Sequence, residues 1–357
     1  MKRLPIHCLL CISLCALPVL AACDRTSEEG SPSPTESRPT LYYFTWSDYA
    51  GPEIIREFEE QARVKVVVDT FSSNEELLAK LQSGASGYDV AVPSDFMVSI
   101  MASQGFLAEL DLTKIPNVTK LLERLQGLPF DPENRYSIPY LWGTVGIAYD
   151  SAIVSPPPDS WSVLWDPRYK GKISMLNDQR EVFGATLRYM GESMNSRDAV
   201  TIEAAKGKLL AQKPLVKTYT SELYDQLLVA GEVVLAHGWG GTVARAMAER
   251  PSIRYAIPKE GGTIWADCLV VLRTSRNKDL AMQFVNFLLD REVAARTTKR
   301  LLFASSNREA KDLVPAEIRK NPAIYPPDSV IERMEWMTDV GEAIRLYDRA
   351  WIELKMG

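Results

Sequence analysis

Residues suited to metal or nucleophilic chemistry are scarce in this sequence. Only two histidines occur among its 357 residues, and His7 lies in a segment that we expect to be cleaved, which leaves His237. A centre built from several histidines and a histidine-based catalytic relay are therefore nearly excluded. Four of the five cysteines precede residue 24, so Cys268 is the single thiol of the expected mature chain and no intramolecular disulfide can form. We predict no metal, no cofactor and no enzymatic activity.

The sequence also lacks an excess of positive charge. It has 41 lysines and arginines against 46 aspartates and glutamates, for a formal net charge of −5. This balance argues against nucleic acid as a partner, because phosphates require a basic surface, and it suits cationic partners. Neither a P-loop nor a dinucleotide-binding fingerprint occurs, and no repeat of fixed period is found. With 46% hydrophobic and 24% charged residues, the chain predicts a globular protein large enough for two lobes.

The first residues have the pattern of a lipoprotein signal. Two basic residues precede an apolar run at residues 9–20, which is too short to span a bilayer comfortably, and a Leu-Ala-Ala-Cys motif follows, ending at Cys23. The pattern predicts a signal peptide at residues 1–22, cleavage before Cys23 and lipidation of its thiol, which would anchor the protein to a membrane outside the cytoplasm. An ordinary secretory signal with a chance cysteine is the alternative.

A tether is expected between the lipid anchor and the folded body. Residues 23–40 are rich in serine, proline, threonine and glutamate and have too few apolar groups to fold, so they predict a lipidated, disordered tether. Asp24 directly follows the lipidated cysteine and resembles the signal that retains lipoproteins at the inner membrane in enteric-type sorting. We therefore expect the protein in the periplasm or cell envelope, anchored by its N-terminal lipid.

From residue 41 onward, strand-like and helix-like segments alternate. Strands are predicted at residues 41–45, 64–70 and 88–92, with one helix beginning at Pro52 and another at a capping box that starts at Ser73. This order predicts an α/β fold with a parallel sheet covered by helices on both faces. Later strands are predicted at residues 171–175, 215–219, 233–237 and 253–257, later helices at 182–190, 198–211, 223–229 and 242–248, and a crossing between lobes at 129–142.

Aromatic and acidic side chains follow several predicted strands. In open α/β sheets, ligands bind outside the carboxyl ends of the strands, so these side chains are candidates for a binding site. They are Trp46, Ser47, Asp48, Tyr49, Ser94, Asp95, Phe96, Asp178, Glu181, Trp239, Trp265 and Asp267. An aromatic face attracts an ammonium group by about 0.5–2 kcal/mol, and carboxylates form charge-assisted hydrogen bonds with N–H donors. The combination predicts a site for a flexible chain that carries several amines.

Several of these residues also have a purely structural interpretation. Asp178 and Glu181 could be solvated charges at a helix N-terminus, and isolated tryptophans are usually core residues. Asp95 is more typical of a helix cap than of a ligand group, and His237 of a core histidine with satisfied nitrogens. Cys268 lies in an apolar run and is more typical of a small buried hydrophobe than of a nucleophile. We assign five tryptophans to structure: Trp142, Trp161, Trp165, Trp336 and Trp351.

Seven short motifs resemble those of one protein family. They are WSDY (46–49), YDVAVPS (88–94), YSIPYLWG (136–143), REVF (180–183), PKEGG (258–262), FLL (287–289) and WMTDVG (336–341). On these motifs, residues 41–357 resemble the polyamine-binding proteins of bacterial ABC importers, the spermidine/putrescine-binding family. The resemblance implies the type II fold of periplasmic binding proteins, in which two lobes, each a mainly parallel sheet flanked by helices, close on a ligand in the cleft between them. The implied N-terminal lobe is 41–145 and 268–312, and the C-terminal lobe is 146–267 and 313–357.

The resemblance also implies a role for each site residue. One amine end would be held by Trp46, Ser47, Asp48 and Tyr49, with Ser94 and Phe96 beside them. Asp178 and Glu181 would reach amines from the second lobe. Trp239 and Trp265 would enclose the methylenes, and Asp267 would pair with an ammonium. Spermidine binders of the family tend to carry tyrosine where this chain has Phe96 and Phe303, and glutamine where it has Met337. Each replacement removes a hydrogen-bonding group worth only about 1 kcal/mol. The mixture of features favours spermidine, with putrescine close behind.

The resulting hypothesis is a monomeric solute-binding lipoprotein. It would capture a polyamine by hinge closure and deliver it to the permease of an ABC importer. A polyamine-sensing receptor that binds a membrane signalling protein is one alternative, because both roles use the same cleft. A glycosidase is another, because carboxylates that flank an aromatic cleft also suit that chemistry. Against the glycosidase, no acid in the sequence shows a reason for a raised pKa.

Overall fold

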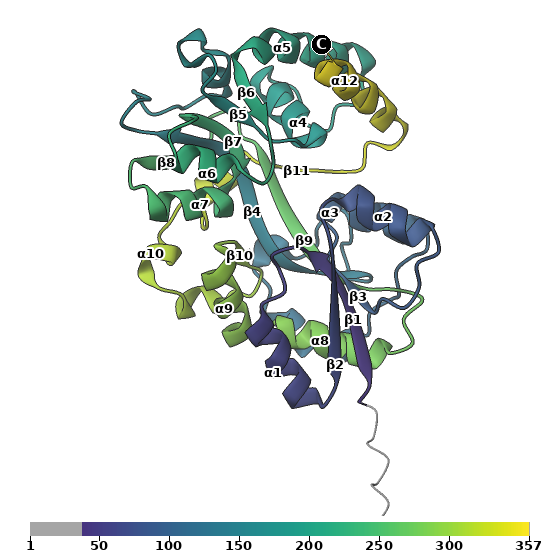
Figure 1. Cartoon of the computed structure of the whole chain (residues 1–357). Coiled ribbons are helices and arrows are strands. Elements are labelled where there is room, and N and C mark those ends of the chain that lie inside the picture. The colour runs from purple at the N-terminus through teal and green to yellow at the C-terminus, as the bar shows by residue number, and fades with distance from the viewer. Residues whose placement is uncertain (1–37, 357) are drawn as a thin grey trace, which may run out of the picture. The chain divides into compact units, whose positions relative to one another are not determined.

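One sheet runs through the part of the chain that the structure describes. The computed structural model describes residues 38–356 and contains an eleven-stranded sheet in the order β2-β1-β3-β9-β4-β7-β5-β6, with β8 and β10 paired to β4 and β11 paired to β9 (Figure 1). The predicted signal peptide, the lipidation of Cys23, the sorting role of Asp24 and most of the tether lie outside the described residues.

The strands and helices have the following bounds. The strands are β1 (Thr40–Trp46), β2 (Lys65–Phe71), β3 (Val90–Ala91), β4 (Ser137–Asp150), β5 (Ile173–Met175), β6 (Val216–Tyr219), β7 (Leu235–Trp239), β8 (Ile253–Ala256), β9 (Thr263–Val271), β10 (Ala304–Ser305) and β11 (Glu335–Trp336). The helices are α1 (Pro52–Ala62), α2 (Asn74–Gln82), α3 (Asp95–Ser103), α4 (Gln179–Tyr189), α5 (Ala199–Gln212), α6 (Tyr224–Val229), α7 (Gly240–Glu249), α8 (Lys278–Leu288), α9 (Arg291–Leu301), α10 (Ala316–Arg319), α11 (Asp328–Ile331) and α12 (Ile344–Met356). Every predicted strand and helix is present, with ends shifted by up to a few residues.

Helices cover both faces of the β1–β3 part of the sheet, as predicted. β1 pairs in parallel with β2 and with β3. Successive side chains of a strand point to opposite faces, so Tyr43 and Phe44 enter different cores. Tyr43 packs edge-on against Phe284 of α8, with ring centroids 5.1 Å apart, while Phe44 lies in the cluster that contains Leu77 of α2 and Met101 of α3. The predicted α/β class with a mainly parallel sheet is confirmed for this part of the chain.

Two long antiparallel strands lie in the middle of the sheet; β9 was predicted only in part, from the apolar run around Cys268, and β4 was not predicted as a strand. β4 pairs with β9 along Ser137–Thr144 and with β7 along Val145–Tyr149, so it joins the β1–β3 part of the sheet to the β5–β7 part (Figure 1). All fourteen residues of β4 are buried. A strand buried on both faces lacks the alternation of apolar and polar residues that marks a strand in sequence, which explains the omission. The predicted lobe boundaries remain a prediction.

Helix starts follow the predicted capping chemistry with small shifts. Ser73 caps α2, since its hydroxyl accepts a hydrogen bond from the Glu76 amide at 3.1 Å. The Glu76 carboxylate accepts from the amide of Ser72 at 2.8 Å rather than from that of Ser73, so the capping box is displaced by one residue. Pro52 is the first residue of α1, where its missing N–H costs nothing.

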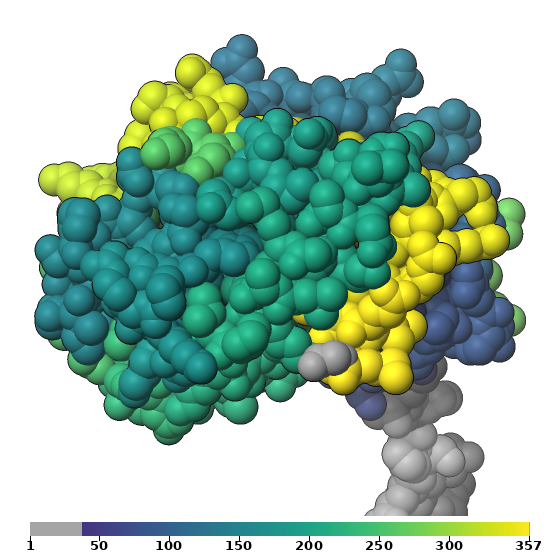
Figure 2. Space-filling view, turned by 90° about the horizontal axis from the view of Figure 1, so that it is seen from above, coloured from purple at the N-terminus to yellow at the C-terminus, as the bar shows by residue number. Residues whose placement is uncertain are grey.

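The C-terminal helix α12 packs on α5. Lys206 of α5 pairs with Glu353 of α12 at 2.5 Å, and the Lys213 ammonium donates to the Leu354 carbonyl at 2.6 Å. In Figure 2 this C-terminal segment, in yellow, lies beside the teal and green residues of the same face. Among the described residues, no helix combines the length and the apolar composition required to cross a bilayer.

Cys268 and His237 are both fully buried, and one of the two predictions about them needs correction. Cys268 is a buried free thiol of β9, as predicted, and burial raises its pKa well above the usual value. His237 is a core residue, but neither ring nitrogen has a hydrogen-bond partner among the described residues, so the prediction of satisfied nitrogens is wrong. Burial lowers the pKa of His237 to about 3, and its ring packs edge-on against Trp161 at 5.3 Å. The imidazole therefore stays neutral.

The buried carboxylate of Asp131 accepts several hydrogen bonds from the backbone at the start of β4. It accepts hydrogen bonds from the amides of Arg135, Tyr136 and Ser137 at 2.8–2.9 Å and from the Ser137 hydroxyl at 2.8 Å.

We expect Asp131→Ala to lower the free energy of unfolding by about 2–4 kcal/mol, because it leaves these donors unpaired. Urea unfolding would measure the loss. Asp279→Ala, at a side chain that is 81% exposed, is the control and should change stability by less than about 1 kcal/mol; equal losses in the two variants would contradict the role of Asp131.

Candidate functional site

The carboxylate of Asp267 on β9 joins the segments that follow β1 and β3. Tyr49 donates its phenolic hydrogen to Asp267 Oδ2, and the Ser94 hydroxyl donates to Oδ1 at 2.7 Å. Asp267 is only 5% exposed. Burial raises its pKa to about 6, although the bonds from Tyr49 and Ser94 oppose the shift. Burial and the nearby Asp267 raise the pKa of Tyr49 well above the usual value, so Tyr49 remains a donor.

Aromatic rings line the same region. Trp265 meets Phe303 edge-on, with ring centroids 5.2 Å apart, and Tyr49 lies 6.3 Å from Phe303 and 6.5 Å from Trp46. The indole of Trp265 lies directly over Gly143 of β4, where an added Cβ would come within 2.7 Å of the ring. Glycine at position 143 therefore permits the observed position of Trp265.

Trp239 lies on the other side of β4 from Trp265. Trp239 pairs with Val145 of β4, whereas Trp265 pairs with Gly143, so one strand separates the two tryptophans. Gly241, two residues after Trp239 in α7, lies against Phe303: an added Cβ there would be 2.2 Å from the Phe303 ring. Trp239 is half-buried with its ring 6.4 Å from that of Tyr224, and the segment that carries it approaches Phe303 through Gly241.

Helix α4 contributes two carboxylates at its N-terminus. Asp178 is the N-cap and accepts from the amide of Glu181 at 3.0 Å, which fits the structural interpretation of this residue. Glu181 does not, because it is 4% exposed and therefore not a solvated charge. The Thr263 hydroxyl of β9 donates to Glu181 Oε2 at 2.5 Å. Burial, followed by the charges of Asp178 and Asp95, raises the pKa of Glu181 well above its ordinary value.

Asp95 departs from its predicted role as a helix cap. Ser94 occupies the N-cap position of α3, and Asp95 is the first helical residue, with an exposed fraction of 1%. Its carboxylate accepts from the amide of Phe96 at 2.7 Å and from the amide of Ala266 at 3.3 Å. Burial raises the pKa of Asp95 to about 8, with the charge of Asp267 adding to the shift. No acid showed a reason for a raised pKa in the sequence alone, but the burial of Asp95 supplies one, so that argument against a glycosidase does not hold.

In the part of the chain that the structure describes, no cation pairs directly with these acids, although the charge of Arg180 opposes the rise in the pKa of Asp95, Asp178 and Glu181. Among the described residues, no lysine, arginine or histidine nitrogen lies within 4.0 Å of the carboxylates of Asp95, Asp178, Glu181 or Asp267. Arg180 is the neighbouring cation, but its guanidinium donates to the Thr338 carbonyl at 3.2 and 3.3 Å and to the Asn195 side chain at 3.1 Å. Within residues 38–356, no three histidine, cysteine or acidic side chains form a group that could hold a metal ion.

Other predicted site residues contribute no side-chain hydrogen bond to this cluster. Ser47 and Asp48 are exposed, and only the backbone carbonyl of Asp48 is bonded, to Arg300. Phe96 is half-buried on α3 beside Asp95, and Met337 is buried just after β11, which pairs with β9.

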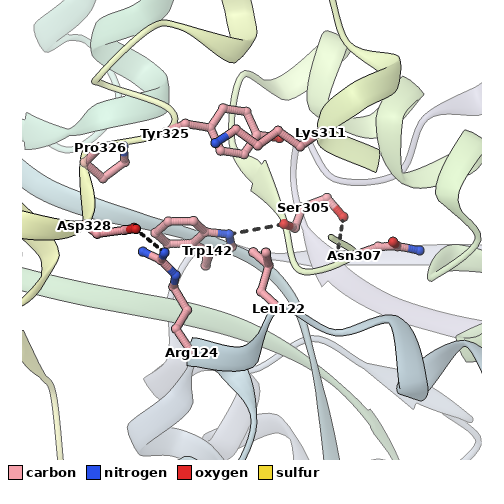
Figure 3. A pocket seen from close by; sticks show the side chains of 9 residues that line it. All are labelled: Leu122, Arg124, Trp142, Ser305, Asn307, Lys311, Tyr325, Pro326 and Asp328. Atoms are coloured by element: carbon pink, nitrogen blue, oxygen red, sulfur yellow. Dashed lines mark hydrogen bonds and ion pairs between the residues drawn. The ribbon is translucent and has the colours of Figure 1, made fainter. Parts of the chain in front are cut away.

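Trp142 lines a cavity together with Arg124, Ser305 and Asp328 (Figure 3). The Trp142 indole N–H donates to the Ser305 carbonyl at 3.2 Å, and the Arg124 guanidinium lies over the ring while pairing with Asp328. The indole N–H and the ring face of Trp142 are thus both in contact with protein groups, in agreement with its assigned structural role.

Comparison with known proteins identifies the family. The model of the bacterial extracellular solute-binding proteins matches residues 53–326. The chain belongs to this family. Spermidine/putrescine-binding periplasmic protein 1 of Haemophilus influenzae is 34% identical over 351 residues, covering 97% of this chain and 98% of the relative. The spermidine/putrescine-binding periplasmic protein of Escherichia coli is 35% identical over 320 residues, covering 89% and 92%.

A solved structure confirms the fold of this solute-binding protein. The Tp0655 (TpPotD) lipoprotein of Treponema pallidum matches with a TM-score of 0.82 at 32% identity, covering 89% of this chain and 100% of that chain. The two-lobed, type II periplasmic-binding-protein fold expected from the motifs is thus confirmed, and so is the resemblance to the spermidine/putrescine-binding family.

The sequence did not reveal which acids of this solute-binding protein are buried together. Asp95 and Asp267 are distant in sequence and meet only because the turn after β3 packs on β9. The sequence likewise does not show that Gly143 and Gly241 lie against aromatic rings, because contact with a ring from a distant residue leaves no local pattern. Gly143 lies two residues before Val145, the strand partner of Trp239, but such a spacing does not mark a binding site in sequence.

The buried acids predict that the ligand-free solute-binding protein loses stability as the pH rises. A carboxyl whose pKa is higher in the folded than in the unfolded state binds more protons when folded, so its stabilisation is full below about pH 4 and is lost as the pH approaches about 8. Glu181→Gln removes one such group and keeps an acceptor for Thr263, so it should reduce the loss between pH 5 and pH 8. Urea unfolding at several pH values measures this; Asp279→Asn is the control, and identical pH profiles for Glu181→Gln and the unmodified protein would refute the prediction.

Proposed function

We propose that this solute-binding protein captures a polyamine in the periplasm and delivers it to an ABC importer. The observation that carries the proposal is a set of buried carboxylates that have no directly paired cation among the described residues, with the rings of Tyr49, Trp265 and Phe303 beside Asp267. The names of the relatives, which state spermidine and putrescine binding, support the same ligand class. Anchoring through Cys23, the predicted lobe boundaries and the monomeric state belong to the proposal.

The chemistry of the site suits a slender, multiply charged guest. Ammonium groups can pair with Asp267 at one end and with Glu181 and Asp178 at the other, which lie on β9 and α4 respectively. The charge of a bound ammonium lowers the pKa of a neighbouring carboxyl and so favours its ionised form. Trp265, Trp239 and Phe303 offer apolar surfaces to the methylenes between the amines. The indole nitrogens of Trp46 and Trp265 are buried and have no hydrogen-bond partner among the described residues.

Spermidine is the favoured ligand, with putrescine close behind. Phe303 and Met337 are buried or packed against other rings and offer no hydrogen-bonding group, so the site depends on its carboxylates for polar contacts. A third ammonium would use the surplus of acids better than a diamine, because each unpaired buried carboxylate disfavours the charged state of the others.

The two other functions are separable by experiment. A glycosidase would need one acid with a raised pKa, and Glu181 has one, but the relatives carry the names of binding proteins and we propose no enzymatic activity. A sensing receptor would bind the same polyamine and differ only in its membrane partner, so permease and ATPase genes beside the coding gene favour import.

Calorimetric titration of the delipidated protein with putrescine, spermidine and spermine tests the proposal. We expect spermidine to bind most tightly, and its affinity to fall as salt concentration rises because ion pairs carry part of the binding energy. The order of affinities identifies the ligand. Failure to bind any of the three would refute polyamine capture.

Replacement of Asp267 should damage binding severely. Asp267→Ala leaves a buried ammonium without its partner, so we expect spermidine affinity to fall by about 100-fold or more. Asp279→Ala, which removes an exposed acid outside this region, is the charge-matched control. Unchanged affinity in Asp267→Ala, measured by calorimetry on protein with a normal melting curve, would remove Asp267 from the site.

Two glycine replacements test whether the position of Trp265 matters for binding, apart from the general effect of adding a methyl group to a helix or strand. Gly143→Ala should displace the Trp265 indole and weaken spermidine binding by about tenfold or more, because small misplacements of contacting groups are costly. Gly207→Ala in α5, where an added Cβ meets no atom within 4 Å, should leave binding unchanged. Equal affinities in the two variants would show that the position of Trp265 does not matter for binding.

A further inference from the structure

A groove lies beside the first described residues of the chain. It is formed by the residue before β1, the end of α1 with the residues that follow it, and the loop that leads into α8, which lie at one end of the folded body (Figure 1). Its lining residues are Pro39, Ala62, Val64 and residues 275–280. Two hydrogen bonds join these segments: the Lys65 amide donates to the Pro39 carbonyl at 2.9 Å, and the Asn277 side chain donates to the Thr40 carbonyl at 3.2 Å.

Basic side chains surround this groove. Five exposed cations belong to its lining or lie next to a lining residue in the chain: Arg38, Arg63, Lys65, Arg276 and Lys278. Among the described residues, none of the five has a carboxylate within 4.0 Å. The Lys278 ammonium donates to the Ser275 carbonyl at 3.1 Å, a neutral partner that leaves its charge uncompensated. We call the groove with these five cations the basic groove.

Acids of the same segments compensate little of this charge. Asp279 pairs with Lys114 at 2.6 Å, and the Glu59 carboxylate accepts from the Val66 amide at 2.8 Å. Glu60, in the last turn of α1, is the exposed acid that remains. The surroundings of the basic groove are therefore positively charged, although the whole chain has a formal net charge of −5. Such a local excess of positive charge attracts an anionic partner.

The place of the basic groove in the chain indicates which anionic partner it fits. Arg38 is the first described residue, and residues 24–37 separate it from Cys23, the predicted point of lipid attachment. A segment of this length spans at most about 50 Å. A lipid on Cys23 would therefore keep the basic groove near the bilayer surface. There, anionic phospholipid head groups attract lysine and arginine within a Debye length, about 8 Å at physiological salt.

We propose that the basic groove binds anionic phospholipid head groups of the membrane to which the protein is anchored. The inference goes beyond polyamine capture and rests on the lipid anchoring that belongs to the proposed function. The lipid limits only the distance between the folded body and the bilayer, whereas contact through the basic groove also determines which end of the body faces the bilayer. The start of β1 and the loop before α8 then face the membrane. Because the contact is electrostatic, it weakens as the salt concentration rises.

Lysine labelling of the anchored protein tests this contact. The mature chain can be coupled through the Cys23 thiol to a maleimide lipid in vesicles, because the other thiol, Cys268, is fully buried. An acylating reagent and mass spectrometry then compare labelling rates on vesicles of phosphatidylcholine alone and of phosphatidylcholine mixed two to one with phosphatidylglycerol. At low salt, we expect Lys65 and Lys278 to react at least about threefold more slowly on the anionic vesicles, and high salt should remove the difference.

Two other lysines serve as an internal reference in the same experiment. Lys170 and Lys172 are exposed just before β5, which lies in the opposite part of the sheet from β1 and β2. They should react equally fast on both kinds of vesicle. This comparison uses the unmodified protein, so it does not depend on the folding of a variant. Equal rates for Lys65 and Lys278 on neutral and anionic vesicles would overturn the proposal while leaving anchoring and polyamine capture intact.

Charge reversal of two arginines should remove the protection. Arg38→Glu combined with Arg276→Glu keeps both reporting lysines and reverses two of the five cations, so Lys65 and Lys278 should react at nearly the same rate on both kinds of vesicle. Arg333→Glu combined with Arg349→Glu changes the net charge equally at two exposed arginines outside the basic groove and should preserve the protection. Equal protection in the two double variants would contradict the role of the basic groove.

Two further outcomes separate this inference from its premises. Mass spectrometry of the protein from its native cells shows whether Cys23 carries a lipid, and an unmodified Cys23 would refute the anchoring and this inference together. Glycerol phosphate, the soluble part of an anionic head group, should give little protection to Lys65 and Lys278. Protection by glycerol phosphate as strong as that by anionic vesicles would overturn the membrane as the partner and favour a soluble anion.

Discussion

The burial of carboxylates without cationic partners is the constraint on which the rest of this site depends. Asp95, Glu181 and Asp267 are each at most 5% exposed, and a charge in such a place is strongly disfavoured relative to water. Hydroxyl groups from Tyr49, Ser94 and Thr263 and amides from α3 and β9 offset part of this cost. The apolar clusters around the sheet must supply the remainder, so the folded protein tolerates the acids without being stabilised by them.

β9 organises this arrangement within five residues. Thr263 bonds Glu181 of α4, Trp265 meets Phe303, the Ala266 amide bonds Asp95, and Asp267 receives Tyr49 and Ser94. Adjacent residues of a strand point to opposite faces, so a shift of β9 by one residue would turn Trp265 and Asp267 away together. The long antiparallel pairing of β9 with β4 fixes this register. Both strands are buried along their whole length.

Local chemistry was predictable from sequence and long-range pairing was not. Strand and helix signals such as Pro52 and Ser73 located β1–β3 and their helices because each depends on a few neighbouring residues. β4 was missed because burial on both faces removes its alternation. The candidate aromatic and acidic residues were found from their position after strands. The burial of Asp95 depends on a contact across 171 residues, and a single sequence carries no signal for it.

The proposed polyamine guest suits this geometry better than an inorganic cation would. A metal ion concentrates its charge at one point and requires ligands on several sides of it, whereas the buried acids are carried separately by α3, α4 and β9, and the described residues contain no suitable group of three. A polyamine distributes its charge along a chain whose amines can reach separate carboxylates. Burial of its methylenes against the aromatic walls adds favourable hydrophobic energy, a contribution that no bare ion can make. Selectivity therefore follows from the separation of the acids as much as from their number.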